Sequence, residues 1–165
     1  MPDKRVFLSL GSNLGDRRQN LDRALHLLTQ NGVEIVRQSS IYETEPQDIS
    51  AQPWFLNLAL ECRTKLFPIQ LLKVLLRIER ELGRERRSIK SAKGPRLIDI
   101  DLILYGHSSI NCPKLTVPHS RMLQRRFVLV PLMEIDAQLR HPGSGRLLKD
   151  HLNEIRGQVV RILDD

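Results

Sequence analysis

Apolar residues occur in short runs that predict β-strands along the chain. Each run is bounded by polar or turn-forming residues, as is typical of a buried strand. The runs lie at residues 6–10, 33–37, 55–62 and 97–105. The last of these is the strongest strand signal in the chain. Residues 106–115 predict a short hairpin, whereas the polar, proline-containing stretch at residues 39–53 predicts a loop.

Two other stretches have mostly apolar residues at the spacing of a helix. The first follows Asp16, a residue type that caps helices at the N-terminus, and it continues to Gly32. The second starts at Pro68, where a missing N–H is tolerated, and ends at Gly83. The residues at this spacing, which form one stripe along each helix, are Leu21, Ala24, Leu25 and Leu28 in the first and Ile69, Leu72, Leu75, Leu76 and Glu79 in the second.

Strands that alternate with two helices predict an α/β (α+β) sandwich. We expect a mostly antiparallel sheet with the helices packed on one face. Residues 125–135 mix helical and extended signals, and residues 147–163 predict a terminal helix. Because no repeat or long linker divides the chain, residues 1–165 are expected to form a single domain.

The composition is that of a globular protein. Of the 165 residues, 41% are hydrophobic and 27% are charged, and this balance argues against disorder. No run approaches the ~18–20 apolar residues that a membrane span needs. Cys62 and Cys112 form no C-x-x-C pattern, which favours two reduced thiols over a disulfide or zinc site. We therefore expect a cytoplasmic protein without a membrane partner.

Positive charge is concentrated in two segments. The chain has 26 Lys and Arg residues against 19 Asp and Glu residues, a net charge of +7. Residues 84–96 hold six basic residues and one acidic residue, and residues 121–126 hold three basic residues. A basic protein suggests nucleic acid as a partner, but a long duplex favours a broad basic face. Two compact clusters instead favour a small ligand with several phosphates.

Asp99 and Asp101 lie within the strongest predicted strand. Because side chains alternate along a strand, both carboxylates should point to one face, with Ile98, Ile100 and Leu102 pointing into a core. Two carboxylates this close repel each other and are costly to desolvate. A divalent cation would remove that cost, and Mg²⁺ prefers a few carboxylates together with phosphate oxygens. For an isolated D-x-D pattern, an exposed strand face or pairing with arginines is the commoner explanation.

The segment before this strand favours phosphate chemistry. It contains Arg84, Arg86, Arg87 and Arg96. Arginine binds phosphate through two parallel hydrogen bonds and keeps its charge, and Mg²⁺ ligands beside guanidinium groups are typical of phosphoryl transfer. The alternative is a solvated, flexible loop. Both interpretations hold for a segment that is mobile without ligand and closes over the ligand once it binds.

His119 lies close to the second basic segment. A lone histidine is more often structural than catalytic, but the neighbouring Arg121, Arg125 and Arg126 favour a contact with phosphate. Residues 11–15 match neither glycine-rich phosphate-loop pattern, so they predict a tight turn between strand and helix.

These motifs occur in an order that resembles the 6-hydroxymethyl-7,8-dihydropterin pyrophosphokinases of folate biosynthesis. The order is Gly11-Ser12-Asn13, Phe55-Leu56-Asn57, Arg84, Gly94-Pro95-Arg96-x-x-Asp99-x-Asp101, Val117-Pro118-His119 and Arg125-x-Phe127. The resemblance spans roughly residues 5 to 150, and the block G-P-R-x-x-D-x-D with a downstream V-P-H is highly specific. It implies a single-domain ferredoxin-like α/β sandwich and a cytosolic enzyme. That enzyme would move the diphosphoryl group of ATP onto the pterin hydroxymethyl oxygen and leave AMP.

The resemblance also implies residue roles on the phosphate side. Asp99 and Asp101 match the ligands of two Mg²⁺ ions. Arg84 and Arg96 match catalytic arginines, which would neutralise charge on the transferred group. The residues that match contacts to ATP are His119, Arg125, Arg86 and Arg84.

On the pterin side, the resemblance agrees with the chemistry of the ligand. A pterin is flat and has an edge of donors and acceptors, so it needs aromatic stacking and a few polar groups. Phe55 and Phe127 match the stacking aromatics, Asn57 matches a contact to the pterin edge, and Thr44 matches a further loop contact. Asn57 also shares the strand face of Phe55, which without the resemblance would be a core residue.

Three positions depart from the family pattern. Lys93 and Ser120 stand where aromatic residues are often found, and Glu45 stands where proline is often found. No residue stands out as a general base, and an alcohol attacking phosphorus through a loose transition state needs little help from one. The resemblance implies ATP as co-substrate and two Mg²⁺ ions as cofactor. We expect a monomer with no nucleic-acid partner.

Two other functions compete with this interpretation. A small basic nucleic-acid-binding sandwich without ATP turnover would explain the net charge, but the strongest strand carries aspartates where base-stacking aromatics would be expected. A kinase that transfers one phosphoryl group would share the aspartates and arginines, but it would be expected to have a nucleotide-binding loop motif.

Overall fold

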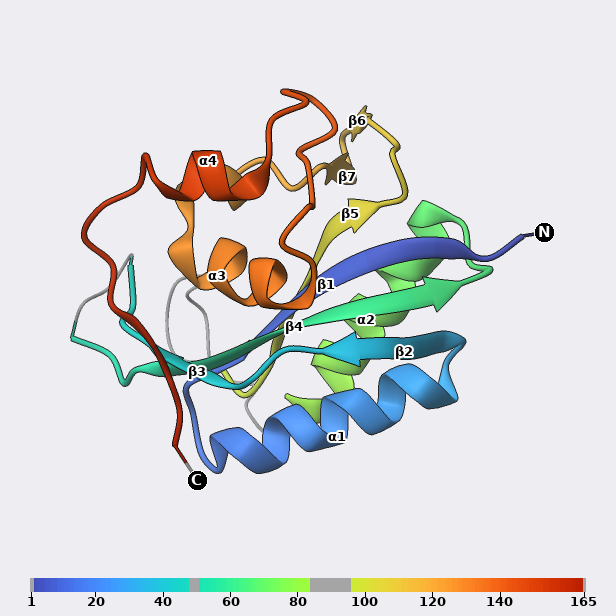
Figure 1. The fold of residues 1–165 in the computed structure, drawn as a ribbon. Helices are drawn as coiled ribbons and strands as arrows, with labels where there is room; N and C mark the ends of the chain where they lie inside the picture. The colour runs from blue at the N-terminus through green and yellow to red at the C-terminus, as the bar shows by residue number, and fades with distance from the viewer. Residues whose placement is uncertain (1, 48–50, 84–95, 165) are drawn as a thin grey trace.

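The structure is a computed structural model, and it describes residues 2–47, 51–83 and 96–164. Figure 1 shows the arrangement of the helices and strands. In chain order they are β1 (Lys4–Ser12), α1 (Arg17–Gln30), β2 (Val33–Gln38), β3 (Tyr42–Thr44), β4 (Phe55–Thr64), α2 (Pro68–Leu82), β5 (Asp99–Tyr105), β6 (Ile110–Cys112), β7 (Leu115–Val117), the 3₁₀-helix η1 (Met122–Gln124), α3 (Arg126–Ile135), α4 (Leu148–Leu152) and β8 (Val160–Ile162).

The described strands form a six-stranded sheet and a small hairpin of β6 and β7. The sheet order is β5-β1-β4-β3-β8. β2 also pairs with β4, at a different part of that strand from β3. Every pairing between these strands is antiparallel. The order β5-β1-β4-β2, with α1 and α2 as connections, is that of a ferredoxin-like sandwich. The predicted fold class is therefore confirmed.

Local signals place the first two helices as predicted. The Asp16 side chain accepts a hydrogen bond from the backbone N–H of Gln19 at 3.0 Å, which caps α1. Pro68 opens α2, and Gly83 caps its C-terminus. Strands predicted at residues 6–10, 33–37, 55–62 and 97–105 correspond to β1, β2, β4 and β5, and the predicted hairpin corresponds to β6 and β7.

Helices cover both faces of the sheet, so the expectation of helices on one face is wrong. Figure 1 shows α1 and α2 on one side and α3 and α4 on the other. Val6, Leu8 and Leu10 of β1 pack in the core beneath α1 and α2. Phe7 of β1 and Ile103 of β5 belong to a second core beneath α3. A strand buried on both faces has a near-continuous apolar sequence, and in β1 the run from Val6 to Leu10 is interrupted by Ser9 alone.

Two predictions between and after these elements are also wrong. Part of the stretch at residues 39–53 is the strand β3, and part of the predicted terminal helix at residues 147–163 is the strand β8. Gly157 has φ of 101°, a left-handed conformation that interrupts a helix. Because β3 and β8 are short strands that pair with each other, their conformation depends on contacts remote in sequence. Most of the loop predicted at 84–96 lies outside the described residues.

Glu61 of β4 pairs with arginines on the two neighbouring strands. Its side chain is 7% exposed and accepts hydrogen bonds from Arg37 Nε at 2.8 Å and Arg5 Nε at 2.7 Å. Arg5 also donates to Asp136 at 2.9 Å, just after α3. The hydrogen bond from Arg37 is the largest influence that lowers the pKa of Glu61, against the opposing effect of burial.

We expect the substitution Glu61→Gln to lower the free energy of unfolding at pH 7 by about 1.5–3 kcal/mol, the range for hydrogen bonds to charged groups. A carboxyl whose pKa is lowered by folding stabilises the protein above its unfolded pKa and loses that effect as the pH falls through its folded pKa. Urea unfolding of wild type and variant should therefore differ at pH 7 and converge at acidic pH. The exposed Glu34→Gln change on β2 is the matched control. An equal difference at both pH values would contradict this account.

Candidate functional site

A row of residues across three strands forms the floor of the main pocket. In the register of the sheet, Gly11 of β1 lies opposite Asn57 of β4 on one side and Asp99 of β5 on the other. Directly opposed residues share a face, and this is the face on which α3 packs. Because α3 covers only part of that face, the row remains open as a pocket floor.

Gly11 allows the close packing of this floor. A Cβ atom at that position would lie 2.5 Å from Asn57 Oδ1 and 3.4 Å from a ring carbon of Phe55. The Asn57 Nδ2 atom donates a hydrogen bond of 2.6 Å to Thr44 Oγ1, and both residues are buried. The hydroxyl of Thr44 thus fixes the Asn57 amide, so that its Oδ1 atom lies over Gly11.

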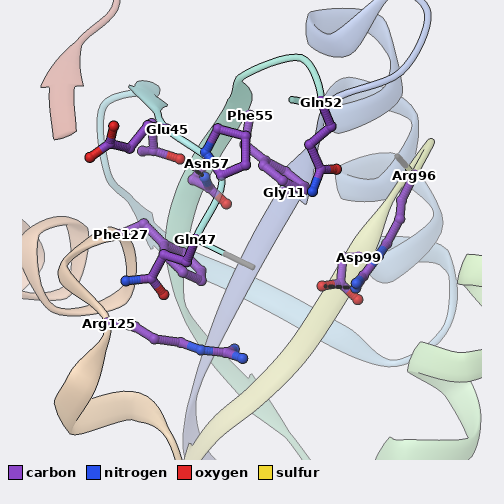
Figure 2. Close-up of a pocket in the computed structure, with 12 residues that line it drawn as sticks. Gly11, Glu45, Gln47, Gln52, Phe55, Asn57, Arg96, Asp99, Arg125 and Phe127 are labelled. Carbon is purple, nitrogen blue, oxygen red and sulfur yellow. Dashed lines mark hydrogen bonds and ion pairs between the residues drawn. The ribbon is translucent and has the colours of Figure 1, made fainter. Parts of the chain in front are cut away.

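The four predicted pterin-binding residues come together at this pocket. Thr44, Phe55, Asn57 and Phe127 all line it, although they come from β3, β4 and α3. Phe127 reaches the pocket from the N-terminal turn of α3, and Figure 2 shows it with Phe55 in the same pocket. Two aromatic rings beside a fixed amide suit a flat heterocycle with donors and acceptors along its edge.

The two aspartates point to the same face, as the strand alternation predicts. Asp99 pairs with Gly11 and Asp101 pairs with Ser9, so both stand on the pocket face of β5. Their side chains are 32% and 28% exposed, whereas Ile98, Ile100 and Leu102 are buried in the core on the other face. β5 is an edge strand of the sheet, and Asp99 lines the pocket there, with Asp101 next to it on the same face.

The acidic pair has the electrostatics of a cation site. Burial raises the pKa of Asp101 most, the Asp99 carboxylate raises it further, and Arg125 and Arg96 partly oppose this. The ionised form of Asp101 is therefore incompletely compensated by the protein. Carboxylate oxygens are the donors that Mg²⁺ prefers. No cluster of three or more His, Cys, Asp and Glu side chains suited to a metal occurs in the described ranges. Mg²⁺ is commonly held by one or two carboxylates with substrate phosphates, so the residues fit this cation.

Two arginines converge on the acidic pair. Arg96 contacts Asp99 at 2.9 Å, and an Arg125 nitrogen lies 3.8 Å from an Asp101 oxygen. In Figure 2 they approach from different sides of the pocket. The Arg96 Nε atom is buried and makes no hydrogen bond within the described part of the chain. It thus keeps a donor for an anionic ligand.

Asn13 positions Arg96 through the backbone. The Arg96 N–H donates to Asn13 Oδ1 at 2.7 Å, and the Asn13 N–H donates to the Arg96 carbonyl at 3.1 Å. Asn13 is 1% exposed, and its amide nitrogen donates in turn to Gln52 and to the Pro53 carbonyl. The Gly11-Ser12-Asn13 motif therefore supports both the floor of the pocket and its cationic rim.

His119 lies near the same rim but does not line the pocket. Its backbone N–H donates to the Ile103 carbonyl at 3.0 Å, which attaches this segment to β5, and its Nδ1 accepts from the Arg121 N–H at 3.2 Å. Burial lowers the pKa of His119 most, and the charge of Arg125 lowers it further. A neutral ring with Nδ1 engaged can donate from Nε2. The other predicted phosphate-binding residues, Arg84 and Arg86, lie outside the described residues, as does Lys93.

Glu79 is a site neighbour that the sequence interpretation missed. It lies on α2, and its carboxylate accepts a hydrogen bond of 2.7 Å from the backbone N–H of Ile100, between the two aspartates. Burial raises the pKa of Glu79 most, and the Asp99 and Asp101 carboxylates raise it further. The available signal was its position in an otherwise apolar helical stripe. Glu79 attaches the edge strand to α2 where the acidic pair stands.

Comparisons with known proteins agree on one family. Residues 7–137 match the family model described as 7,8-dihydro-6-hydroxymethylpterin-pyrophosphokinase (HPPK). The chain is 45% identical over 140 residues to the 2-amino-4-hydroxy-6-hydroxymethyldihydropteridine pyrophosphokinase of Bacillus subtilis, covering 84% of this chain and 82% of that one. It is 44% identical over 132 residues to a folate synthesis bifunctional protein of Arabidopsis thaliana, covering 80% of this chain and 27% of that one.

The solved structures that resemble the chain belong to larger proteins. The crystal structure of Plasmodium falciparum HPPK-DHPS with pteroate superposes with a TM-score of 0.75 at 16% identity, covering 93% of this chain and 42% of that one. At this identity the likeness shows the fold alone. The chain spans about a quarter of the length of the Arabidopsis bifunctional protein. Among the described residues, no helix is long and apolar enough to cross a membrane.

Proposed function

The chain belongs to the 7,8-dihydro-6-hydroxymethylpterin-pyrophosphokinase family, and from this premise we propose that it makes a pterin diphosphate in folate synthesis. The diphosphoryl group of ATP is transferred to the hydroxymethyl oxygen of 6-hydroxymethyl-7,8-dihydropterin, and AMP is released. The observation that carries the proposal is one pocket in which two aromatic rings and a fixed amide adjoin Asp99, Arg96 and Arg125.

The aromatic part of the pocket binds the pterin in this proposal. Phe55 and Phe127 contact the ring faces, while Asn57 and Thr44 recognise the edge through hydrogen bonds. The Asn57 amide is held by Thr44 before any ligand arrives, so little ordering is needed on binding. The same packing excludes water from the ring and directs the hydroxymethyl group toward the charged rim.

The charged rim binds ATP in this proposal. Asp99 and Asp101 hold two Mg²⁺ ions, which when bound supply charge neutralisation and polarisation of the phosphate oxygens. Arg96, with Arg84, neutralises charge that develops on the transferred group. His119, Arg125 and Arg86 contact the phosphates. The support for these roles is the convergence of Arg96 and Arg125 on the acidic pair.

The bonds that change define the product. The hydroxymethyl oxygen forms a bond to the β-phosphorus, and the bond from that phosphorus to the α,β-bridging oxygen breaks. AMP leaves with the bridging oxygen, and the hydroxyl proton is released. Holding the alcohol and the triphosphate at adjoining parts of one pocket supplies the proximity that such a transfer needs.

We place this reaction in a single cytoplasmic domain of residues 1–165 that acts as a monomer on small-molecule substrates. Light scattering on the purified protein tests the monomer. A mass near 19.1 kDa supports it, and a mass near twice that value contradicts it.

The nucleotide product is the direct test of the proposed reaction. Purified protein with ATP, Mg²⁺ and the hydroxymethyl pterin should form AMP and pterin diphosphate in equal amounts. ADP as the product would indicate transfer of a single phosphoryl group. No turnover together with tight, steeply salt-dependent RNA binding would favour the nucleic-acid-binding alternative. The Asp101→Asn variant, purified in the same way, reports any contaminating kinase.

A further inference from the structure

We propose that Gln158, in the C-terminal segment outside the family-matched residues 7–137, is a positioning residue that joins two walls of the pterin pocket. One wall is the chain that follows β3, and the other is the first turn of α3. The inference rests on the proposed function for its ligand, but its structural basis does not depend on the ligand.

Gln158 connects the two walls through the two ends of one side-chain amide. Its Nε2 donates to the Glu45 carbonyl at 2.9 Å, and its Oε1 accepts from the Phe127 N–H at 3.2 Å. Glu45 and Phe127 both line the pocket, although they are far apart in sequence. A single amide therefore relates the positions of both walls, and Gln158 itself does not line the pocket.

The contact to Phe127 supplies a cap that α3 otherwise lacks. The first N–H groups of a helix have no partner within the helix, and the N-cap residue Arg125 makes no side-chain capping bond. Gln158 satisfies the Phe127 N–H from a remote segment, and the Gln158 carbonyl accepts from Arg126 Nε at 3.1 Å. The turn that carries the stacking ring is thus held by Gln158 through both its side chain and its backbone.

The chain around Gln158 is held firmly enough to serve this role. The Glu45 N–H donates to the Val159 carbonyl at 3.2 Å, and the Val159 N–H donates to the Glu45 carboxylate at 2.8 Å. β8 then continues as a strand paired with β3. On β8, the Arg161 guanidinium lies 5.1 Å from the centre of the Trp54 ring and contacts Glu43 at 2.8 Å.

These contacts predict a specific consequence for binding. If the Gln158 amide is lost, β8 stays paired with β3, and α3 stays attached through the hydrogen bond from Tyr42 to Glu134. The fold should survive, but the Phe127 turn and the Glu45 wall lose their common link. Binding of the pterin should then weaken, while binding at the phosphate side, which is built on β5 and Arg96, is retained.

The test compares Gln158→Met, which keeps the length of the side chain without its hydrogen bonds, with wild type. We expect the KM for the pterin to rise about tenfold, the effect of losing one to two hydrogen bonds. The KM for ATP and kcat should stay within about twofold. Arg96 and the acidic pair lie on other elements, and the Arg125 N–H keeps its hydrogen bond of 3.3 Å to the Met122 carbonyl. In the ligand-free protein, amide hydrogen exchange at Phe127 should become faster.

Gln138→Ala, at an exposed position after α3, is the control and should change none of these quantities. The emission of Trp54, the sole tryptophan, verifies that β8 remains seated in each variant. Unchanged exchange at Phe127 would overturn the proposed link. Faster exchange with an unchanged pterin KM in an active enzyme would overturn the claim that the Gln158 link matters for pterin binding. An inactive wild-type protein would instead refute the proposed function, and the exchange measurement would still decide whether Gln158 holds the turn.

Discussion

Replacing Asp101 by asparagine is expected to lower turnover about 10³-fold or more while leaving the fold intact. The change keeps the shape of the side chain but removes one charge of the acidic pair. Because burial and the Asp99 carboxylate raise the pKa of Asp101, its ionised form destabilises the ligand-free protein. The variant should therefore melt at the same or a higher temperature than wild type near neutral pH, although it is inactive.

This combination separates a functional role from a structural one. A residue that mattered only for folding would lose activity and stability together. The control is Asp22→Asn at an exposed position of α1, which should change neither activity nor melting temperature. Near-normal turnover of the Asp101 variant at saturating Mg²⁺ would refute the assignment of the acidic pair as the cation site.

Replacing Arg96 by alanine is expected to lower kcat by about 10³-fold, in line with guanidinium groups that stabilise the transition state of phosphoryl transfer. Arg96 contacts Asp99 at 2.9 Å, and the two backbone hydrogen bonds to Asn13 do not need its side chain. The Arg96 backbone should thus keep its place in the variant, and the lost activity can be assigned to the guanidinium. Steady-state kinetics with both substrates measures the effect.

Two further variants test the Arg96 prediction more closely. Arg96→Lys keeps the charge but loses the planar pair of donors, and its kcat should lie between those of alanine and wild type. Arg23→Ala on the exposed side of α1 is the control for a general loss of positive charge. An effect confined to KM would mean that Arg96 binds substrate without stabilising the transition state.

The parts of the fold that depend on local chemistry were predictable from the sequence. The alternation that puts Asp99 and Asp101 on one face is a property of any strand, and it holds in β5. The start of α1 follows from the hydrogen-bonding capacity of Asp16, and the bounds of α2 follow from Pro68 and Gly83. These features need only neighbours in sequence.

Features that depend on long-range pairing were not predictable in this way. β3 and β8 are three-residue strands that pair with each other across the chain, so no local period identifies them. The alignment of Asn57, Gly11 and Asp99 depends on the register between strands, which composition and spacing do not specify. The family resemblance indicated these site residues, while the contacts of Glu79 and Gln158 required the structure.

A crystal structure with Mg²⁺, a non-hydrolysable ATP analogue and the hydroxymethyl pterin tests the central claim most directly. The account predicts Mg²⁺ bound to the Asp99 and Asp101 carboxylates, with Arg96 and Arg125 contacting the triphosphate and the pterin between Phe55 and Phe127. A triphosphate bound elsewhere, with both aspartates free of metal, would contradict it.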